Sequence, residues 1–180
     1  MVPVFKKVMR ESDFEGAVLL HLDAAFNYAR WLTGNDPDAE DVVQDACIRA
    51  MRFFPSLRTP SGRAWLFAIV RNTWYTRVSQ RRIMIECCSD EPLDRDVADN
   101  ALDPEARLLQ QHTVAEVRLA LESLPTHFRE AIVLRELEGL SYKEIAAVTR
   151  VPSGTVMSRL ARARERLLAA LEPARMELMP

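Results

Sequence analysis

The stretch SYKEIAAVTRVPSGTVMSRLARARERLL, residues 141–168, constrains the fold more than any other part of the chain. Ser141 and Glu144 have the spacing of a capping box, which begins a helix by satisfying its free N–H groups. The tripeptide Pro-Ser-Gly at 152–154 then interrupts the pattern, because proline disfavours helix in the preceding residue and glycine tolerates the dihedral angles of a tight turn. A second helix is expected from about Thr155. The sequence therefore predicts two short helices joined by a tight turn.

The second of these helices has two different faces. Apolar residues recur along one side at helical spacing: Val156, Leu160, Ala163, Leu167 and Leu171. Hydroxyl and guanidinium side chains fall away from that side, at about 100° per residue: Thr155, Ser158, Arg159, Arg162 and Arg166. This arrangement is typical of a recognition helix in the major groove of DNA. A solvated basic helix in a helical hairpin would show the same pattern.

Composition limits the other possibilities. The 180 residues suffice for one medium domain or two small ones, and the formal net charge of −2 argues against strong general affinity for DNA. Cys47, Cys87 and Cys88 provide no disulfide framework, which suits a reducing compartment. The first ten residues lack the apolar core of a signal peptide, and no apolar run approaches membrane-spanning length. We therefore expect a soluble, cytoplasmic protein without membrane insertion.

Charge divides the chain into three parts. Residues 63–82 are rich in arginine and contain no acidic residue, whereas residues 86–105 are strongly acidic, include two prolines and show no clear period. The acidic stretch has the composition of a linker. The sequence therefore predicts an all-α fold of two small helical domains, 10–83 and 107–173, joined by an acidic flexible linker at 84–106.

Three helices are expected in the first domain, over 13–32, 37–54 and 63–82. The first has an apolar face made of Val18, Leu22, Ala25, Ala29 and Leu32. Asp36 is expected to cap the second, with Pro37 at its first position. The apolar members of the second helix are Val42, Val43, Ala46 and Ala50, which leaves Asp41, Gln44 and Asp45 for the surface.

The third expected helix mixes arginines with aromatic residues, a combination found where proteins bind single-stranded or melted DNA. Small helical domains usually bury their aromatic residues, so the core is the favoured place for Trp65, Phe67, Ile69 and Val70. The candidates for a nucleic-acid face are Arg71, Asn72, Trp74, Tyr75 and Arg77. The Asn72 amide can both donate to and accept from a base edge.

Three motifs carry a resemblance to bacterial sigma factors of the extracytoplasmic-function (ECF) branch. They are LTGNDPDAEDVVQDACIRAM (32–51), RAWLFAIVRNTWYTRVSQRR (63–82) and LPTHFREAIVLRELEGLSYKEIAAVTRVPSGTVMSRLARARERL (124–167), in family order and at family spacing. The resemblance implies a region 2 and a region 4 joined by a short linker. It also implies binding to core RNA polymerase, recognition of the −10 and −35 promoter elements, DNA opening, and inhibition by an anti-sigma factor.

The resemblance implies roles for particular residues. Asp41, Gln44 and Asp45 would bind a coiled coil of the polymerase β′ subunit, and the helix at 128–138 would pack on the β flap. The loop at 55–62 and the helix after it would read the −10 element, through Arg58, Arg71, Asn72, Tyr75 and Arg77. The −35 element would be contacted by Thr155, Ser158, Arg159 and Arg162, with Tyr142 and Lys143 on phosphates. Met157 and Ala161 depart from the family pattern near this face, so promoter preference does not carry over.

No catalytic, metal or cofactor site is expected. His21, His112 and His127 are scattered, and the adjacent Cys87 and Cys88 lack the spacing of a zinc pair. A cysteine-based redox switch is an open alternative. Two other functions also stay open. A dimeric helix-turn-helix regulator would bind operator DNA without polymerase but leaves the 37–54 motif unexplained. An adaptor that docks on acidic proteins leaves the Arg/Ser face of 155–166 unexplained.

Overall fold

The structure is a computed structural model that describes residues 14–16, 18–54, 61–88 and 110–177, and every regular element in these ranges is helical. The first half contains the 3₁₀ turn η1 (Leu19–His21) and the helices α2 (Leu22–Thr33), α3 (Asp36–Phe53) and α4 (Gly62–Cys88). The second half contains α5 (Gln110–Glu122), α6 (Thr126–Ile132), the π-helical turn η3 (Val133–Leu137), α7 (Tyr142–Thr149) and α8 (Ser153–Glu177). The predicted all-helical fold is confirmed.

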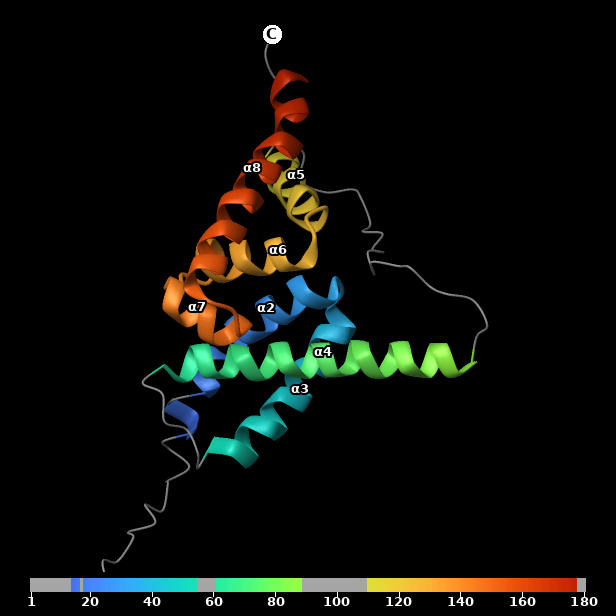
Figure 1. Ribbon diagram of the computed structural model, residues 1–180, viewed down its shortest axis with the longest axis vertical. Helices are drawn as coiled ribbons and strands as arrows, with labels where there is room; N and C mark the ends of the chain where they lie inside the picture. The colour runs from blue at the N-terminus through green and yellow to red at the C-terminus, as the bar shows by residue number, and fades with distance from the viewer. Residues whose placement is uncertain (1–13, 17, 55–60, 89–109, 178–180) are drawn as a thin grey trace, which may run out of the picture.

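Helix α4 crosses the middle of the molecule (Figure 1). Most of α3 lies on one side of it, and the second half lies on the other side, where α7 packs directly against α4. Helix α2 contacts α3, α4 and α6, so it also reaches the second half. One apolar core therefore runs through both halves. Most of the predicted linker, residues 89–106, lies outside the described residues.

The first half buries most of the predicted apolar faces. Val18, Ala25, Ala29 and Leu32 are buried, as are Val42, Ala46 and Ala50, while Leu22 and Val43 are partly covered. The continuous helix expected over 13–32 is wrong, because the 3₁₀ turn Leu19–His21 precedes α2. Sequence periodicity also missed Tyr28, which is fully buried and packs against Phe67 with ring centroids 5.2 Å apart.

Two helix ends in the first half differ from expectation. The cap of α3 is Asn35, whose side chain accepts a hydrogen bond of 2.8 Å from the Asp38 N–H, so Asp36 is already the first helical residue. Asparagine and aspartate are equally good caps, and the sequence alone does not choose between neighbours. Helix α4 continues to Cys88, beyond the expected end at 82, because residues 83–88 contain no glycine or proline.

The helix pair of the second half is present with a different turn. The predicted capping box is confirmed, since Ser141 and Glu144 each bond the other's backbone N–H. These hydrogen bonds lower the pKa of Glu144. The left-handed residue of the turn is Arg150 (φ 57°), and Gly154 lies within α8, which begins at Ser153. The expected use of glycine in the turn is therefore wrong.

The apolar stripe of α8 is confirmed as the side that packs inward. Val156, Leu160 and Ala163 are buried and Leu167 is packed against the core. Ile145 and Val148 of α7 are buried on the facing side. The packing of α7 against α8 fixes which side of α8 faces solvent.

Candidate functional site

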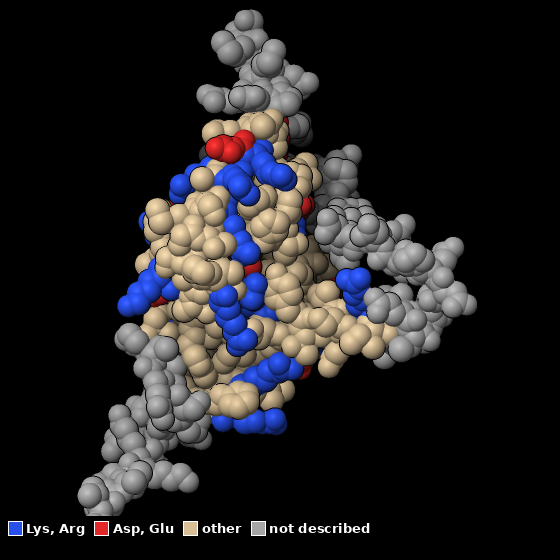
Figure 2. Space-filling model, viewed as in Figure 1, with Lys and Arg blue, Asp and Glu red and all other residues tan. Residues whose placement is uncertain are grey.

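The outer face of α8 and the start of α7 form the candidate −35 surface. Ser158, Arg162 and Lys143 are exposed, whereas Thr155, Arg159 and Tyr142 are partly covered. The Ser158 hydroxyl donates to the Thr155 carbonyl at 3.0 Å. Arginine and lysine side chains gather over this part of the molecule in Figure 2. The structure therefore brings the six predicted side chains to two neighbouring helices.

Tyr142 and Arg159 of this surface interact with other side chains of the protein. The Arg135 guanidinium lies 4.8 Å from the centre of the Tyr142 ring. Arg159 lies near His127, where burial first and then the positive charge of Arg159 lower the pKa of the imidazole. Burial raises the pKa of Tyr75 on α4, and the positive charge of Arg159 partly offsets this rise, so Arg159 lies towards the first half. Arg162 and Ser158 are the more accessible candidates.

The candidate −10 surface on α4 is partly covered by the second half. The Arg71 guanidinium contacts the Glu130 carboxylate through Nε–Oε1 at 2.5 Å and Nη2–Oε2 at 3.3 Å. It also lies 4.5 Å from the centre of the Tyr75 ring. Asn72 is half-buried, and the predicted Arg58 lies outside the described residues. Trp74 and Tyr75 meet edge to face with centroids 4.5 Å apart.

Arg77 does not stand apart from the candidate polymerase-binding residues. Its guanidinium lies 2.8 Å from an oxygen of Asp45 and 3.3 Å from one of Asp41. These three side chains are all at least one-third exposed. The structure therefore joins a residue assigned to DNA with two assigned to polymerase, across the contact between α4 and α3. Neither spacing nor charge pattern revealed this pairing.

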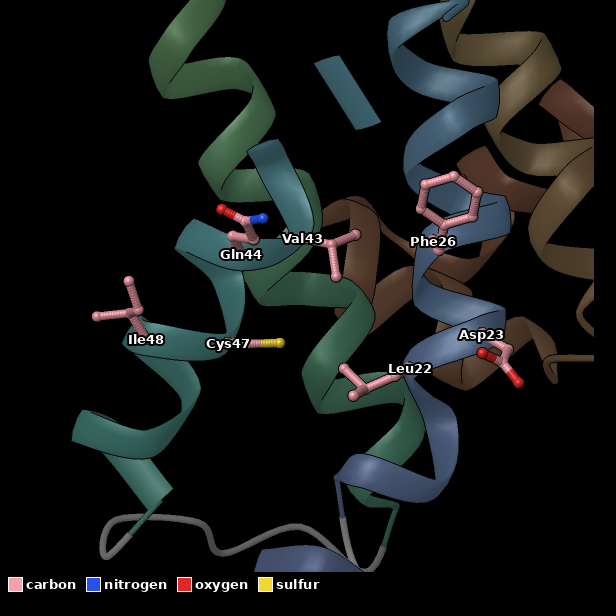
Figure 3. Close-up of a pocket in the computed structure, with 7 residues that line it drawn as sticks. All are labelled: Leu22, Asp23, Phe26, Val43, Gln44, Cys47 and Ile48. Carbon is pink, nitrogen blue, oxygen red and sulfur yellow. The ribbon is translucent and has the colours of Figure 1, made fainter. Parts of the chain in front are cut away.

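Gln44, the third candidate for polymerase binding, borders an apolar hollow between α2 and α3 (Figure 3). The hollow has a volume of about 500 Å³ and is lined by Leu22, Asp23, Phe26, Val43, Gln44, Cys47 and Ile48. The Cys47 thiol points into the space between the two helices (Figure 3), and burial raises its pKa. A raised pKa lowers the thiolate fraction, which disfavours a reactive cysteine here.

Apolar side chains continue beyond this hollow on the surface of α3. Ile48, Met51 and Phe53 are all more than half exposed. Large apolar side chains that gather beside a hollow mark a surface suited to a protein partner. The acidic and the apolar groups of α3 thus lie next to each other.

Five residues join the two halves through contacts that sequence patterns do not indicate. Tyr28 and Arg71 meet the buried Glu130, while Arg63 forms an ion pair with the buried Glu138. Acidic side chains on a helix normally face solvent, so only the tertiary structure reveals the burial of Glu130 and Glu138. Among the described residues, no group of three or more metal-ligating side chains occurs, and no helix is long and apolar enough to cross a membrane.

Both halves of the chain match models of a known protein family. Residues 17–83 match the family model for sigma-70 region 2, and residues 115–167 match the model for sigma-70 region 4. The chain is 39% identical to the ECF RNA polymerase sigma-E factor of Escherichia coli over 143 residues, which cover 76% of this chain and 75% of that protein. It is 38% identical to the ECF RNA polymerase sigma factor SigE of Mycolicibacterium smegmatis over 148 residues, covering 82% of this chain but only 57% of that longer protein.

Solved structures agree in fold. The sigma factor RpoE of Bartonella quintana, in complex with the anti-sigma factor NepR, matches with a TM-score of 0.71 and 34% identity over 89% of this chain and 98% of that one. CnrH in complex with the cytosolic domain of CnrY matches with a TM-score of 0.63 and 28% identity, covering 91% of this chain and 90% of the other. With both regions matched in order and relatives similar across most of its length, the chain belongs to the ECF branch of the RNA polymerase sigma factors.

Proposed function

We propose that this chain binds core RNA polymerase, directs it to promoters with −10 and −35 elements, and promotes DNA opening. The observation that carries the proposal is the presence of three suitable surfaces on one fold. These are the acidic and apolar side of α3, the arginine and aromatic side of α4, and the arginine and hydroxyl side of α8. Its role is that of an initiation factor in the cytoplasm, without catalytic chemistry of its own.

Polymerase binding is assigned to α3. Asp41 and Asp45 offer exposed carboxylates, and Gln44 adds an amide at the edge of the apolar hollow. A partner with basic and apolar side chains, such as the coiled coil of the β′ subunit, is complementary to this surface. The β flap would have a smaller target in the second half, because Phe128 and residues 131–134 are buried and mainly Arg135, Glu136 and Leu137 remain accessible.

Promoter contacts are assigned to α4 and α8. On α4, Arg71 and Arg77 would hold phosphates, while Asn72 and Tyr75 would meet bases of the separated strand. On α8, Ser158 and Arg162 are best placed for base edges in the major groove, and Lys143 for a phosphate. We also infer control by an anti-sigma factor, since the matched RpoE and CnrH structures are complexes with such a protein and with the cytosolic domain of CnrY.

Transcription in vitro tests this function without knowledge of the promoter. Core polymerase would transcribe sheared genomic DNA of the source organism with and without the protein, and the 5′ ends of the transcripts would be sequenced. We expect new 5′ ends only when both components are present, downstream of one shared pair of sequence elements. Specific DNA binding by the purified protein without stimulation of polymerase would instead identify a regulator of the dimeric helix-turn-helix class.

A matched pair of variants locates the polymerase contact. Asp45→Asn and Asp36→Asn remove the same charge from α3, and each aspartate pairs with an arginine in the structure. Asp45→Asn should weaken binding to core polymerase. Asp36→Asn should leave this binding close to wild type, because Asp36 is the first residue of α3 and lies outside the proposed surface. Equal binding by both variants would remove Asp45 from the surface.

A further inference from the structure

Glu130 is a carboxylate buried where the two halves meet. It is 2% exposed, and its two partners among the described residues come from the first half. The Tyr28 hydroxyl donates to it at 2.8 Å, and Arg71 forms the ion pair described above. A carboxylate removed from water requires a cation and hydrogen-bond donors. Glu130 therefore has its described partners only while the halves are in contact.

A second ion pair lies along the same side of α4. Arg63 contacts Glu138, whose side chain is 7% exposed. Residues spaced by four lie on one side of a helix, so Arg63, Phe67, Arg71 and Tyr75 form one row. Phe67 in this row contacts Tyr28. This row, which we call the inner row of α4, faces the second half across the contact seen in Figure 1.

The inner row includes two residues assigned to promoter DNA, Arg71 and Tyr75. Arginine binds carboxylates and phosphates in the same forked geometry, so the two anions compete for one guanidinium. Glu130 holds Arg71 through two of its nitrogens, and only 15% of the Arg71 side chain is exposed. A DNA strand can reach this guanidinium only after Glu130 has left it.

We propose that Glu130 is an internal competitor for promoter DNA, which keeps the free chain closed until the two halves separate. Glu138 assists it through Arg63. The burial of Tyr28 and the negative charge of Glu130 also raise the pKa of the Tyr28 hydroxyl, so it remains a donor at pH values where a free tyrosine ionises. The inference rests on the proposed function only for the identity of the competing ligand, since closure of the free chain is a property of the protein alone.

The test combines two measurements on the full-length protein without polymerase. Small-angle X-ray scattering reports whether the halves separate. Fluorescence anisotropy reports binding to a short fluorescein-labelled single-stranded DNA of mixed sequence. The variants are Glu130→Gln, Glu138→Arg, and the charge exchange Arg63→Glu with Glu138→Arg. Glu136→Arg is the matched control, because it makes the same charge change and breaks an ion pair with Arg164 inside the second half.

We expect Glu130→Gln and Glu138→Arg to increase the radius of gyration and to tighten binding to the DNA by about tenfold or more. A binding-competent state populated at roughly 0.1–10% weakens the apparent affinity by that fraction, and opening removes the loss. The charge exchange should restore the wild-type radius, and Glu136→Arg should not change it.

Three results would overturn the proposal. The first is a Glu130→Gln variant of unchanged helicity that keeps both the wild-type radius and the wild-type affinity. The second is a charge-exchange variant whose radius of gyration is as large as that of Glu138→Arg. The third is an increased radius of gyration in the Glu136→Arg control. Failure of the proposed function has a different signature, namely expansion of the two variants without tighter DNA binding and without stimulation of polymerase by any form of the protein.

Discussion

A tyrosine hydroxyl and a carboxylate share a buried site at the centre of this molecule. Tyr28 is fully buried, and burial together with the charge of Glu130 raises its pKa well above the ordinary value of 10.0. Above about pH 10 the unfolded chain loses a proton that the folded chain retains. Tyr28 therefore makes its full contribution to the free energy of unfolding below about pH 10. That contribution is lost as the pH rises towards the pKa of Tyr28 in the folded state.

Tyr28→Phe should reveal both effects. At neutral pH the variant should lower the free energy of unfolding by about 1–3 kcal/mol, because the buried Glu130 loses a donor. Above about pH 10 its stability should fall less steeply than that of the wild type, because one shifted group is gone. Urea unfolding near neutral pH and above pH 10 measures both. Parallel pH dependences of the two proteins would show that Tyr28 ionises as easily when folded as when unfolded.

The pairing of these residues was outside the reach of sequence patterns. Tyr28 and Glu130 are 102 positions apart, and Arg71 and Glu130 are 59 apart. Periodicity indicates which side of one helix is apolar, but it does not indicate which helix lies opposite. The pairing of Arg77 with Asp41 and Asp45 was missed for the same reason. The role of Asn72 in reading the −10 element stays a prediction.

Two exposed arginines of α8, Arg162 and Arg164, have different surroundings. Arg162 is exposed on the side opposite Leu160, whereas Arg164 forms an ion pair of 2.6 Å with Glu136. Arg162→Ala should weaken transcription from promoters with an intact −35 element by roughly 5- to 150-fold, since a lost base contact costs about 1–3 kcal/mol. Arg164→Ala is the control on the same helix and should have a smaller effect.

The specificity of this loss can be checked on paired templates. The ratio of transcription from the intact promoter to transcription from the promoter with a scrambled −35 element should be smaller for Arg162→Ala than for the wild type. The reason is that the variant no longer reads the element. If Arg162→Ala lowers transcription equally on both templates, the side chain holds a phosphate or supports the fold.

The existence of the helices was more predictable than their ends. Apolar spacing and the capping box identified α3, α7 and the stripe of α8, because each depends on residues close in sequence. The ends depended on choices that several residues could satisfy. Asn35 and Asp36 both can cap, and Arg150 adopted the left-handed conformation although Gly154 was available nearby. Tertiary packing settles such choices, and a single sequence does not contain it.

The whole molecule combines a net charge of −2 with a locally basic surface. Lysine and arginine dominate the charged groups on the face shown in Figure 2. Several acidic side chains form ion pairs between elements instead. Local charge can attract DNA where net charge does not. Region 2 and region 4 each have their own motif in the sequence. In the structure they also contact each other directly, through packed helices and buried ion pairs.

Contact between the halves should make the protein unfold as one unit. Two tethered domains without a shared interface would melt separately, whereas here Glu130 and Glu138 are buried with partners from the opposite half. We expect a single calorimetric transition for the wild type, with equal calorimetric and van't Hoff enthalpies. Glu138→Arg should split it into two transitions, because the like charges of Arg63 and the new arginine separate the halves.

The charge exchange and the control complete this experiment. Arg63→Glu combined with Glu138→Arg restores opposite charges across the interface, so a single transition should return. Glu136→Arg breaks a contact within the second half and should leave one transition at a lower temperature. Two transitions in the wild-type protein would mean that the buried pairs contribute too little free energy to couple the halves. In that case closure could not compete with promoter DNA, because a contact too weak to couple unfolding is also too weak to hold Arg71 against a phosphate.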